Sequence, residues 1–283
     1  MDDDAVFDHP HVTALLELAV TEDVGAGDCT SEATVPETAR ARGRLLVKEP
    51  LVVCGLPLLE RVFGRVGGAS CTRIAAEGQR ARHGDVIAVV EGTARTLLTG
   101  ERLALNLVQH LCGIATLTRA CVEQVAGTGL VIRDTRKTVP GMRLLAKYAV
   151  RTGGGTNHRM GLDDAILVKD NHLALGGGDF AAAVAAARRE FPQRPLEVEA
   201  RTLVEVERAV RAQPDLILLD NMSIDDMTAA VRLVDGRVPL EASGGIRIDD
   251  LPAVARTGVR YVAMGQLTHS APAVDLSLKL EPA

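Results

Sequence analysis

The chain has 283 residues, of which 47% are hydrophobic and 24% charged, as is typical of a globular protein with one large or two modest domains. Aromatic residues are only 2% and the formal net charge is -5, which argues against a nucleic-acid-binding surface. The five cysteines show no zinc spacing, the N-terminus is acidic and no apolar run approaches the ~20 residues of a membrane span. We therefore expect a cytoplasmic protein with no nucleic-acid partner and no membrane segment.

The first part of the chain predicts a small α+β unit. Apolar spacing predicts a helix over 11–20, and a connector rich in Gly, Asp, Ser and Thr follows over 22–36. Two short strands over 41–54, a helix over 56–66 and further β structure over 70–96 complete this unit.

A long apolar helix pattern covers 97–125, with a break expected near Gly113. Arg102 and His110 interrupt its apolar surface. We interpret His110 as a core residue, whereas Arg102 either faces a site or subunit or forms a structural salt bridge.

After Gly127, apolar strand patterns alternate with helix patterns, which predicts a parallel sheet of βα units. The strand patterns are GLVIRDT, AILVKD, PLEVEA, DLILLD, VPLEAS and YVAMG. About six strands are visible, fewer than the eight of a complete barrel. The pattern predicts either an incomplete barrel or an open sheet.

Each predicted strand ends in polar side chains that can carry chemistry. These ends contain Asp134 to Lys137, Lys169 to His172, Glu197 and Glu199, Asp220 and Asn221, Glu241 to Gly245, and Gly265 to His269, with Thr135 in the first of them. Active sites of parallel α/β folds lie at the carboxyl ends of strands, so six such ends in succession predict one shared site.

The basic residues near these ends predict a pocket for an anion. Arg136, Lys137, His158, Arg159 and Lys169 could bind carboxylates or phosphates through charge-assisted hydrogen bonds. The alternative, a solvated basic face, is weakened because they flank apolar strands and a flexible triple glycine.

The remaining ends predict a metal and a phosphate. Glu199 and Asp220 offer the hard oxygen ligands that suit Mg²⁺; a glycosidase acid and base, or an ion pair with a lysine, are the alternatives. Glycine-containing loops at Ser243–Gly245 and Met264–Gln266 could cradle a phosphate. Together these features suggest phosphoribosyl transfer onto an acidic acceptor.

Several segments resemble the quinolinate phosphoribosyltransferase family, nearly from end to end. They are EDVGAGDCTS, ERLALNLVQHLCGIAT, RDTRKTVPGMRLLAKYAVRTGGGTNHRMGL, LVKDNH, EVE, LLDNM, LEASGGI and GQLTHS. The resemblance implies an α/β fold with an N-terminal α/β sandwich domain over 1–112, joined by 270–283, and an open, incomplete α/β barrel over 113–269. It also implies a homodimer in which the partner completes each site.

Functional residues follow from the same resemblance. The positions that match the quinolinate site are Arg102 from the partner, Arg136, Lys137, His158, Arg159 and Lys169. Thr135 is expected to bind substrate as well. Those that match the phosphoribosyl pyrophosphate and Mg²⁺ site are Glu199, Asp220, Ser243, Gly244, Gly245, Met264, Gly265 and Gln266, with His269 adjacent. Catalytic roles are expected for Lys137, Lys169, Glu199 and Asp220, with Lys137 nearest the reacting centre.

Two other functions stay open from the sequence. One is a paralogue that acts on another pyridine or aromatic carboxylate, and the other is a non-catalytic ligand-binding accessory protein on the same fold. A related family found beside molybdenum transport genes carries Pro in place of Asn157 and lacks the KDNH segment. Asn157 and Lys169 to His172 therefore favour the transferases.

Overall fold

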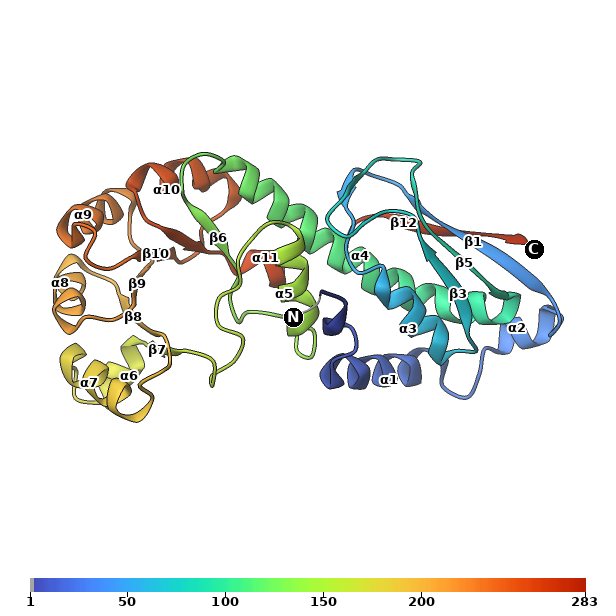
Figure 1. Ribbon diagram of the computed structural model, residues 1–283, viewed down its shortest axis with the longest axis horizontal. Helices are drawn as coiled ribbons and strands as arrows, with labels where there is room; N and C mark the ends of the chain where they lie inside the picture. The colour runs from blue at the N-terminus through green and yellow to red at the C-terminus, as the bar shows by residue number, and fades with distance from the viewer. Residues whose placement is uncertain (1–2) are drawn as a thin grey trace. The chain divides into compact units, whose positions relative to one another are not determined.

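A computed structural model describes residues 3–283, which fold into two compact units (Figure 1). The first unit comprises residues 3–119, 138–154 and 268–283, and the second comprises 120–137 and 155–267. Both contain helices and strands, and the second is built on a parallel sheet, so the predicted α/β fold class is confirmed. The predicted limit between 112 and 113 lies inside helix α4 and stays a prediction. Within 3–283, no helix has the length and apolar character needed to cross a membrane.

The elements of the first unit include most of those predicted before residue 97. Its 3-10 helix and α-helices are η1 (Asp3–Val6), α1 (Pro10–Val24), α2 (Cys29–Thr34), α3 (Pro57–Arg65), α4 (Ala94–Gln124, which enters the second unit at Ala120) and α5 (Arg143–Thr152). Its strands are β1 (Arg40–Val47), β2 (Leu51–Val52), β3 (Ala69–Arg73), β4 (Arg80–Ala81), β5 (Val86–Thr93) and β12 (Leu276–Pro282).

An antiparallel sheet with the order β12-β1-β5-β3 forms the frame of this unit. The β1 sequence alternates, so that Arg40, Arg42 and Arg44 face solvent while the residues between them are buried. The last strand in the chain, β12, pairs with β1 from Val47 opposite Leu276 to Ala41 opposite Pro282. The last strand in the chain thus pairs with the first one.

Two details of the first unit differ from the prediction. The segment expected as a connector contains α2, because the Asp28 carboxylate accepts hydrogen bonds from the Ser31 N–H at 3.0 Å and the Ser31 hydroxyl at 2.5 Å. These contacts hold the pKa of Asp28 below its usual value. Helix α4 is also unbroken at Gly113. The glycine serves packing there, because the chain from Pro272 to Ala273 lies against it and leaves no room for a side chain.

Gly113 therefore provides a test of how tightly α4 packs. A Cβ at this position would lie 2.0 Å from the Pro272 carbonyl oxygen. We expect Gly113→Ala to lower the free energy of unfolding by about 1–3 kcal/mol through overpacking, measured by urea denaturation. Gly64→Ala is the matched control, because Gly64 lies in α3 with nothing within 4 Å of the added Cβ. This control should be neutral or stabilising by up to about 1 kcal/mol; equal effects of the two variants would contradict the packing.

The second unit alternates strands with helices. Its strands are β6 (Val131–Arg133), β7 (Ile166–Val168), β8 (Leu196–Ala200), β9 (Leu216–Asp220), β10 (Leu240–Ser243) and β11 (Tyr261–Ala263). Its remaining elements are α6 (Asp170–Leu175), α7 (Phe180–Glu190), α8 (Leu203–Ala212), α9 (Ile224–Val234), η2 (Ile248–Asp250), α10 (Leu251–Thr257) and α11 (Gln266–His269, which ends in the first unit).

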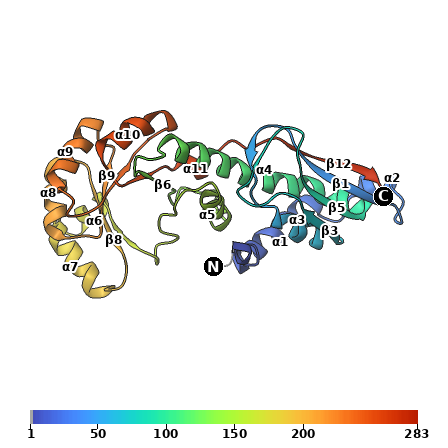
Figure 2. The ribbon, with the colours of Figure 1, turned by 45° about the horizontal axis from the view of Figure 1, so that its top comes forward.

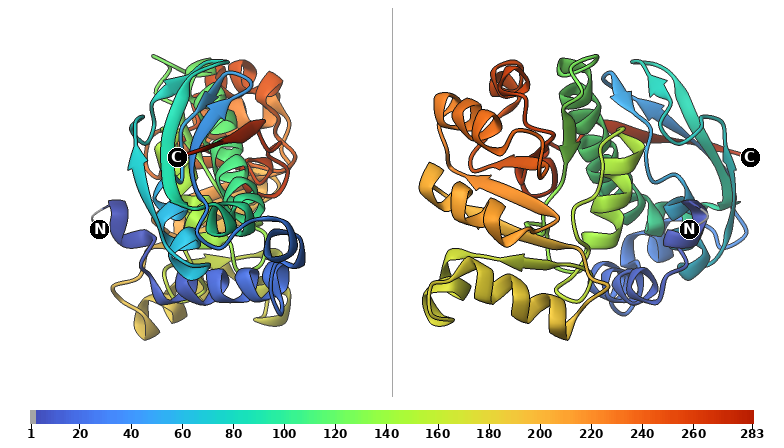
Figure 3. Two further views of the ribbon diagram at one scale, coloured as in Figure 1. Left: turned by 90° about the vertical axis from the view of Figure 1, so that its right-hand side faces the viewer. Right: turned by 60° about the vertical axis from the view of Figure 1, so that its left-hand side comes forward.

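These strands form a parallel sheet with the order β6-β11-β10-β9-β8-β7. No pairing joins β6 to β7 among residues 3–283, so the sheet stays open, as expected for an incomplete barrel. Figures 2 and 3 show α7, α8, α9 and α10 side by side along the outer face of the sheet. The other face is left for the site.

Alternate side chains of each strand point to this inner face. In β8, Leu196, Val198 and Ala200 share one face and the two glutamates share the other, although all five residues are buried. Helices α7 and α8 contact β8. Because those helices cover the outer face, Glu197 and Glu199 point to the inside of the open barrel.

Candidate active site

A cavity of about 320 Å³ lies in the second unit at the carboxyl ends of its strands. Its lining residues are Thr135, Arg136, Lys137, His158, Arg159, Leu167, Lys169, Leu218, Asp220, Ser243 and Ala263. Polar residues that are far apart in the sequence therefore share one cavity, as the strand-end pattern predicts. Their individual roles stay predictions.

The loop that carries His158 is fastened to the end of β6 by Asp134. The buried Asp134 carboxylate accepts hydrogen bonds from the Asn157 side-chain amide at 2.5 Å and from the His158 backbone N–H at 2.9 Å. Thr156 also pairs with Arg133 in a parallel bridge. Asp134 was not among the predicted site residues, and its contacts position both His158 and Arg159.

Cationic side chains form one wall of the cavity. The Thr135 hydroxyl accepts a hydrogen bond from the Lys137 N–H at 3.0 Å, and Arg159 donates to the Ala165 carbonyl at 3.0 Å. Burial and the positive charge of Arg136 lower the pKa of Arg159. Because the surroundings disfavour the charged form of Arg159, a bound anion would stabilise that charged form. The wall suits a ligand with carboxylate or phosphate groups.

Two carboxylates lie at the ends of the neighbouring strands β8 and β9. Glu199 is buried and forms an ion pair with the Lys169 ammonium at 2.7 Å, whereas the half-buried Asp220 lines the cavity itself. The side-chain amide of Asn221 donates to Asp220 at 2.8 Å. Hard oxygen donors of this kind fit Mg²⁺, which binds through one or two carboxylates plus substrate phosphates. Asp220 fits this role directly, while Glu199 is already engaged by Lys169.

A close contact joins the ends of β9 and β10. Asn221 adopts a left-handed backbone with φ 55°, and its N–H donates to the Ser243 carbonyl at 3.0 Å. Gly244 has φ 103°, and a Cβ there would lie 2.3 Å from the Asn221 side-chain oxygen. Only glycine fits at position 244, which explains this glycine of the SGG sequence without reference to a ligand.

The remaining predicted residues lie outside the cavity lining. Gly245, Met264, Gly265 and Gln266 belong to the second unit, where Met264 is buried and its N–H donates to the Arg133 carbonyl. Arg102 and His269 belong to the first unit.

Arg201 follows β8, near the acidic strand ends. It is exposed and forms an ion pair with Asp170 at 3.1 Å.

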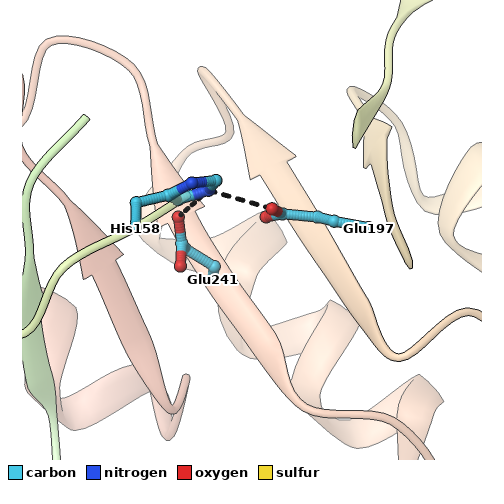
Figure 4. A group of neighbouring side chains, drawn as sticks. All are labelled: His158, Glu197 and Glu241. Carbon is cyan, nitrogen blue, oxygen red and sulfur yellow. Dashed lines mark ion pairs between the residues drawn. The ribbon is translucent and has the colours of Figure 1, made fainter. Parts of the chain in front are cut away.

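A buried charge network lies below the cavity. Its two glutamates, Glu197 and Glu241, belong to the polar strand ends, but no role was predicted for them. Arg133 forms an ion pair with Glu241, and His158 Nε2 lies 2.9 Å from Glu197 and 3.5 Å from Glu241 (Figure 4). Glu197 is 6% exposed and Glu241 is fully buried. Both glutamates lie two residues before a predicted site residue, Glu199 or Ser243. That spacing was the available signal, because residues i and i+2 of a strand share a face.

The network makes stability depend on pH. Burial, followed by the negative charge of Glu197, raises the pKa of Glu241 from 4.5 to about 7, and Arg133 only partly offsets this. The folded state therefore binds a proton more tightly than the unfolded state. The resulting stabilisation is present below pH 4.5 and is lost as the pH rises through about 7.

Glu241→Gln tests this dependence, because glutamine resembles the protonated carboxyl group. We expect the wild-type urea midpoint to fall between pH 5 and pH 8, and the Glu241→Gln midpoint to fall less over the same range. Glu190→Gln, at an exposed position on α7, should follow the wild type. If Glu241→Gln also follows the wild type, Glu241 is not the group responsible.

Family models match most of the chain. The family model described as quinolinate phosphoribosyl transferase, C-terminal domain, matches residues 114–279, and the N-terminal domain model of the same family matches residues 28–112. The C-terminal model covers the whole of the second unit, and the N-terminal model covers the first unit from residue 28 to 112.

Individual relatives agree with the family models. The chain is 44% identical over 273 residues to a nicotinate-nucleotide pyrophosphorylase (carboxylating) of Mycobacterium leprae, covering 94% of this chain and 95% of that protein. It is 38% identical to a probable enzyme of the same name from Bacillus subtilis, covering 95% and 93%. The crystal structure of NadC from Streptococcus pyogenes is similar with a TM-score of 0.91 at 39% identity, covering 96% of this chain and 97% of that one.

Proposed function

Because the chain belongs to the quinolinate phosphoribosyltransferase family, we propose that it transfers the phosphoribosyl group of phosphoribosyl pyrophosphate to quinolinate. The reaction releases pyrophosphate and CO₂ and gives nicotinate mononucleotide for NAD biosynthesis. The observation that carries this proposal is the cavity in which Arg136, Lys137, Arg159 and Lys169 lie together with Asp220.

The cationic wall matches the charge of the acceptor. Quinolinate carries two adjacent ring carboxylates that repel each other, and two guanidinium groups with two ammonium groups can orient both and offset their repulsion. Burial, followed by the charge of Arg136, lowers the pKa of Arg159. Binding of a dianion would favour the charged form of this arginine.

Two bond changes complete the proposed reaction. The quinolinate ring nitrogen forms a bond to C1 of the ribose while the bond from C1 to the pyrophosphate oxygen breaks, and pyrophosphate leaves with the electron pair. The bond to the neighbouring carboxylate then breaks, CO₂ leaves, and the electron pair stays on ring carbon beside the positive nitrogen until a proton is added. Lys137 is the cation that we place nearest this centre, where preorganised charge stabilises the transition state.

Mg²⁺ is proposed as the cofactor, held by Asp220 and Glu199 together with the pyrophosphate. When bound, it would neutralise the charge that develops on the leaving group. Glu199 holds Lys169 at 2.7 Å, so this pair can also orient the lysine toward the acceptor. Ser243 lines the same cavity and can donate its hydroxyl to a phosphate oxygen.

The direct test is incubation with quinolinate, phosphoribosyl pyrophosphate and Mg²⁺, followed by detection of nicotinate mononucleotide and CO₂. Nicotinate and other pyridine carboxylates serve as competing acceptors. Turnover of another acceptor in preference to quinolinate would identify a paralogue with a different substrate. Binding of quinolinate without release of pyrophosphate would identify an accessory protein and overturn the proposal.

Lys137→Ala tests the catalytic wall. We expect turnover to fall at least about 100-fold, because a preorganised cation is lost beside the reacting atoms. The far-ultraviolet circular dichroism spectrum and urea midpoint should stay close to those of the wild type. Lys279→Ala removes an exposed lysine of β12 and should keep full activity. Wild-type turnover of Lys137→Ala would remove Lys137 from the mechanism.

The proposal includes a homodimer in which Arg102 of each subunit completes the partner's site. Arg102→Ala and Lys169→Ala should each be inactive alone. After mixing and subunit exchange, one site of each heterodimer would carry both substitutions and the other would be intact, so partial activity should return. Absence of complementation, with exchange verified by mass spectrometry, would contradict the shared site. Reaction in the cytoplasm is proposed as well, which the free thiols of all five cysteines favour.

A further inference from the structure

The charge network below the cavity contains a histidine whose two ring nitrogens are both engaged by the protein. Three residues of this network, His158, Glu197 and Glu241, bring one nitrogen or oxygen atom each within 4.8 Å of one another (Figure 4). His158 is 9% exposed, and its Nε2 points toward Glu197 and Glu241. Both glutamates are nine-tenths or more buried, so this end of the imidazole is shielded from solvent.

The other ring nitrogen defines the protonation state. The backbone N–H of Arg159 donates a hydrogen bond to His158 Nδ1 at 2.7 Å. A ring nitrogen that accepts a hydrogen bond carries no proton. The proton of a neutral imidazole must then lie on Nε2, where it points at the Glu197 carboxylate 2.9 Å away. The geometry describes one tautomer of an uncharged ring.

Arg133 already supplies a positive charge beside His158. It pairs directly with Glu241, so the two glutamates do not depend on an imidazolium for a counter-charge. A divalent cation bound by the same three residues would lie beside the Arg133 guanidinium, which would repel it.

We propose that Glu197 and Glu241 are positioning residues that hold His158 as a neutral Nε2–H imidazole. His158 then contributes an uncharged ring to the cavity wall, and it adds no positive charge. The charge that binds the acceptor comes from the arginines and lysines of the wall, and the uncharged ring borders the flat pyridine. This role deepens the proposed function and, in its kinetic part, rests on it.

The hydrogen bond from His158 separates two substitutions at position 197. Glutamine keeps a side-chain oxygen that can accept from Nε2–H but removes the charge, whereas alanine removes the acceptor. We expect Glu197→Gln to keep kcat/KM for quinolinate within about threefold of wild type. Glu197→Ala should raise KM for quinolinate about tenfold or more, with a smaller change in kcat, because the ring loses its orientation. If Glu197→Gln loses as much as Glu197→Ala, the carboxylate charge is required and the ring is a cation, which overturns the proposal. A wild-type KM in a folded Glu197→Ala variant overturns the positioning role.

Nitrogen NMR of the wild-type protein tests the tautomer without any activity measurement. With ¹⁵N-labelled histidine at neutral pH, the His158 signals are assigned by their loss in His158→Gln. We expect a pyridine-type shift for Nδ1 and a proton-bearing, pyrrole-type shift for Nε2. Two proton-bearing nitrogens, or a proton on Nδ1, overturn the proposal, as does a stoichiometric shift of Nε2 on addition of Zn²⁺. Because the spectrum does not depend on turnover, an inactive wild-type protein would refute the transferase and leave the tautomer to be decided separately. If Glu197→Ala does not fold, the wild-type spectrum still tests the tautomer of His158.

Discussion

The register of the parallel sheet is the constraint on which the site depends. Each strand sends alternate side chains to the inner face, so a polar residue at a strand end has a companion two positions earlier. In β8 these are Glu199 and Glu197, and in β10 they are Ser243 and Glu241. A slip of one residue in β8 would turn both glutamates outward and place Val198 on the inner face. Pairing along the backbone therefore determines where the charges lie.

Two layers of charge with different purposes follow from this register. The outer layer borders the cavity, and its charged lining residues are Arg136, Lys137, Arg159, Lys169 and Asp220. The inner layer consists of Arg133, Glu197 and Glu241, which pair with one another or with His158. Glu197 also acts electrostatically on Arg159, so the two layers are coupled. The inner layer holds the His158 ring in place.

Periodicity was sufficient to predict the strands, the parallel order and the gathering of polar strand ends in one cavity. It was not sufficient for α2, where the Asp28 side chain starts a helix inside a segment rich in turn-forming residues. It also failed at Gly113, where periodicity predicted a break. The glycine packs against Pro272, and a contact so distant in the sequence cannot be seen from local periodicity.

The site showed the same limit. Two glutamates at i and i+2 share a face, but their depth relative to a cavity depends on the neighbouring strands. The orientation of His158 depends on the Arg159 N–H and on Asp134, and no spacing rule contains those contacts.

The contact between Asn221 and Gly244 has a practical consequence for attempts to alter substrate choice. The two residues occupy the same small volume, with the asparagine in a left-handed turn and the glycine leaving space for its amide. In a mutant library that randomises the SGG loop, most variants with a side chain at position 244 would therefore misfold. A useful library would keep Asn221 and Gly244 unchanged and vary the neighbouring Ser243, which lines the cavity.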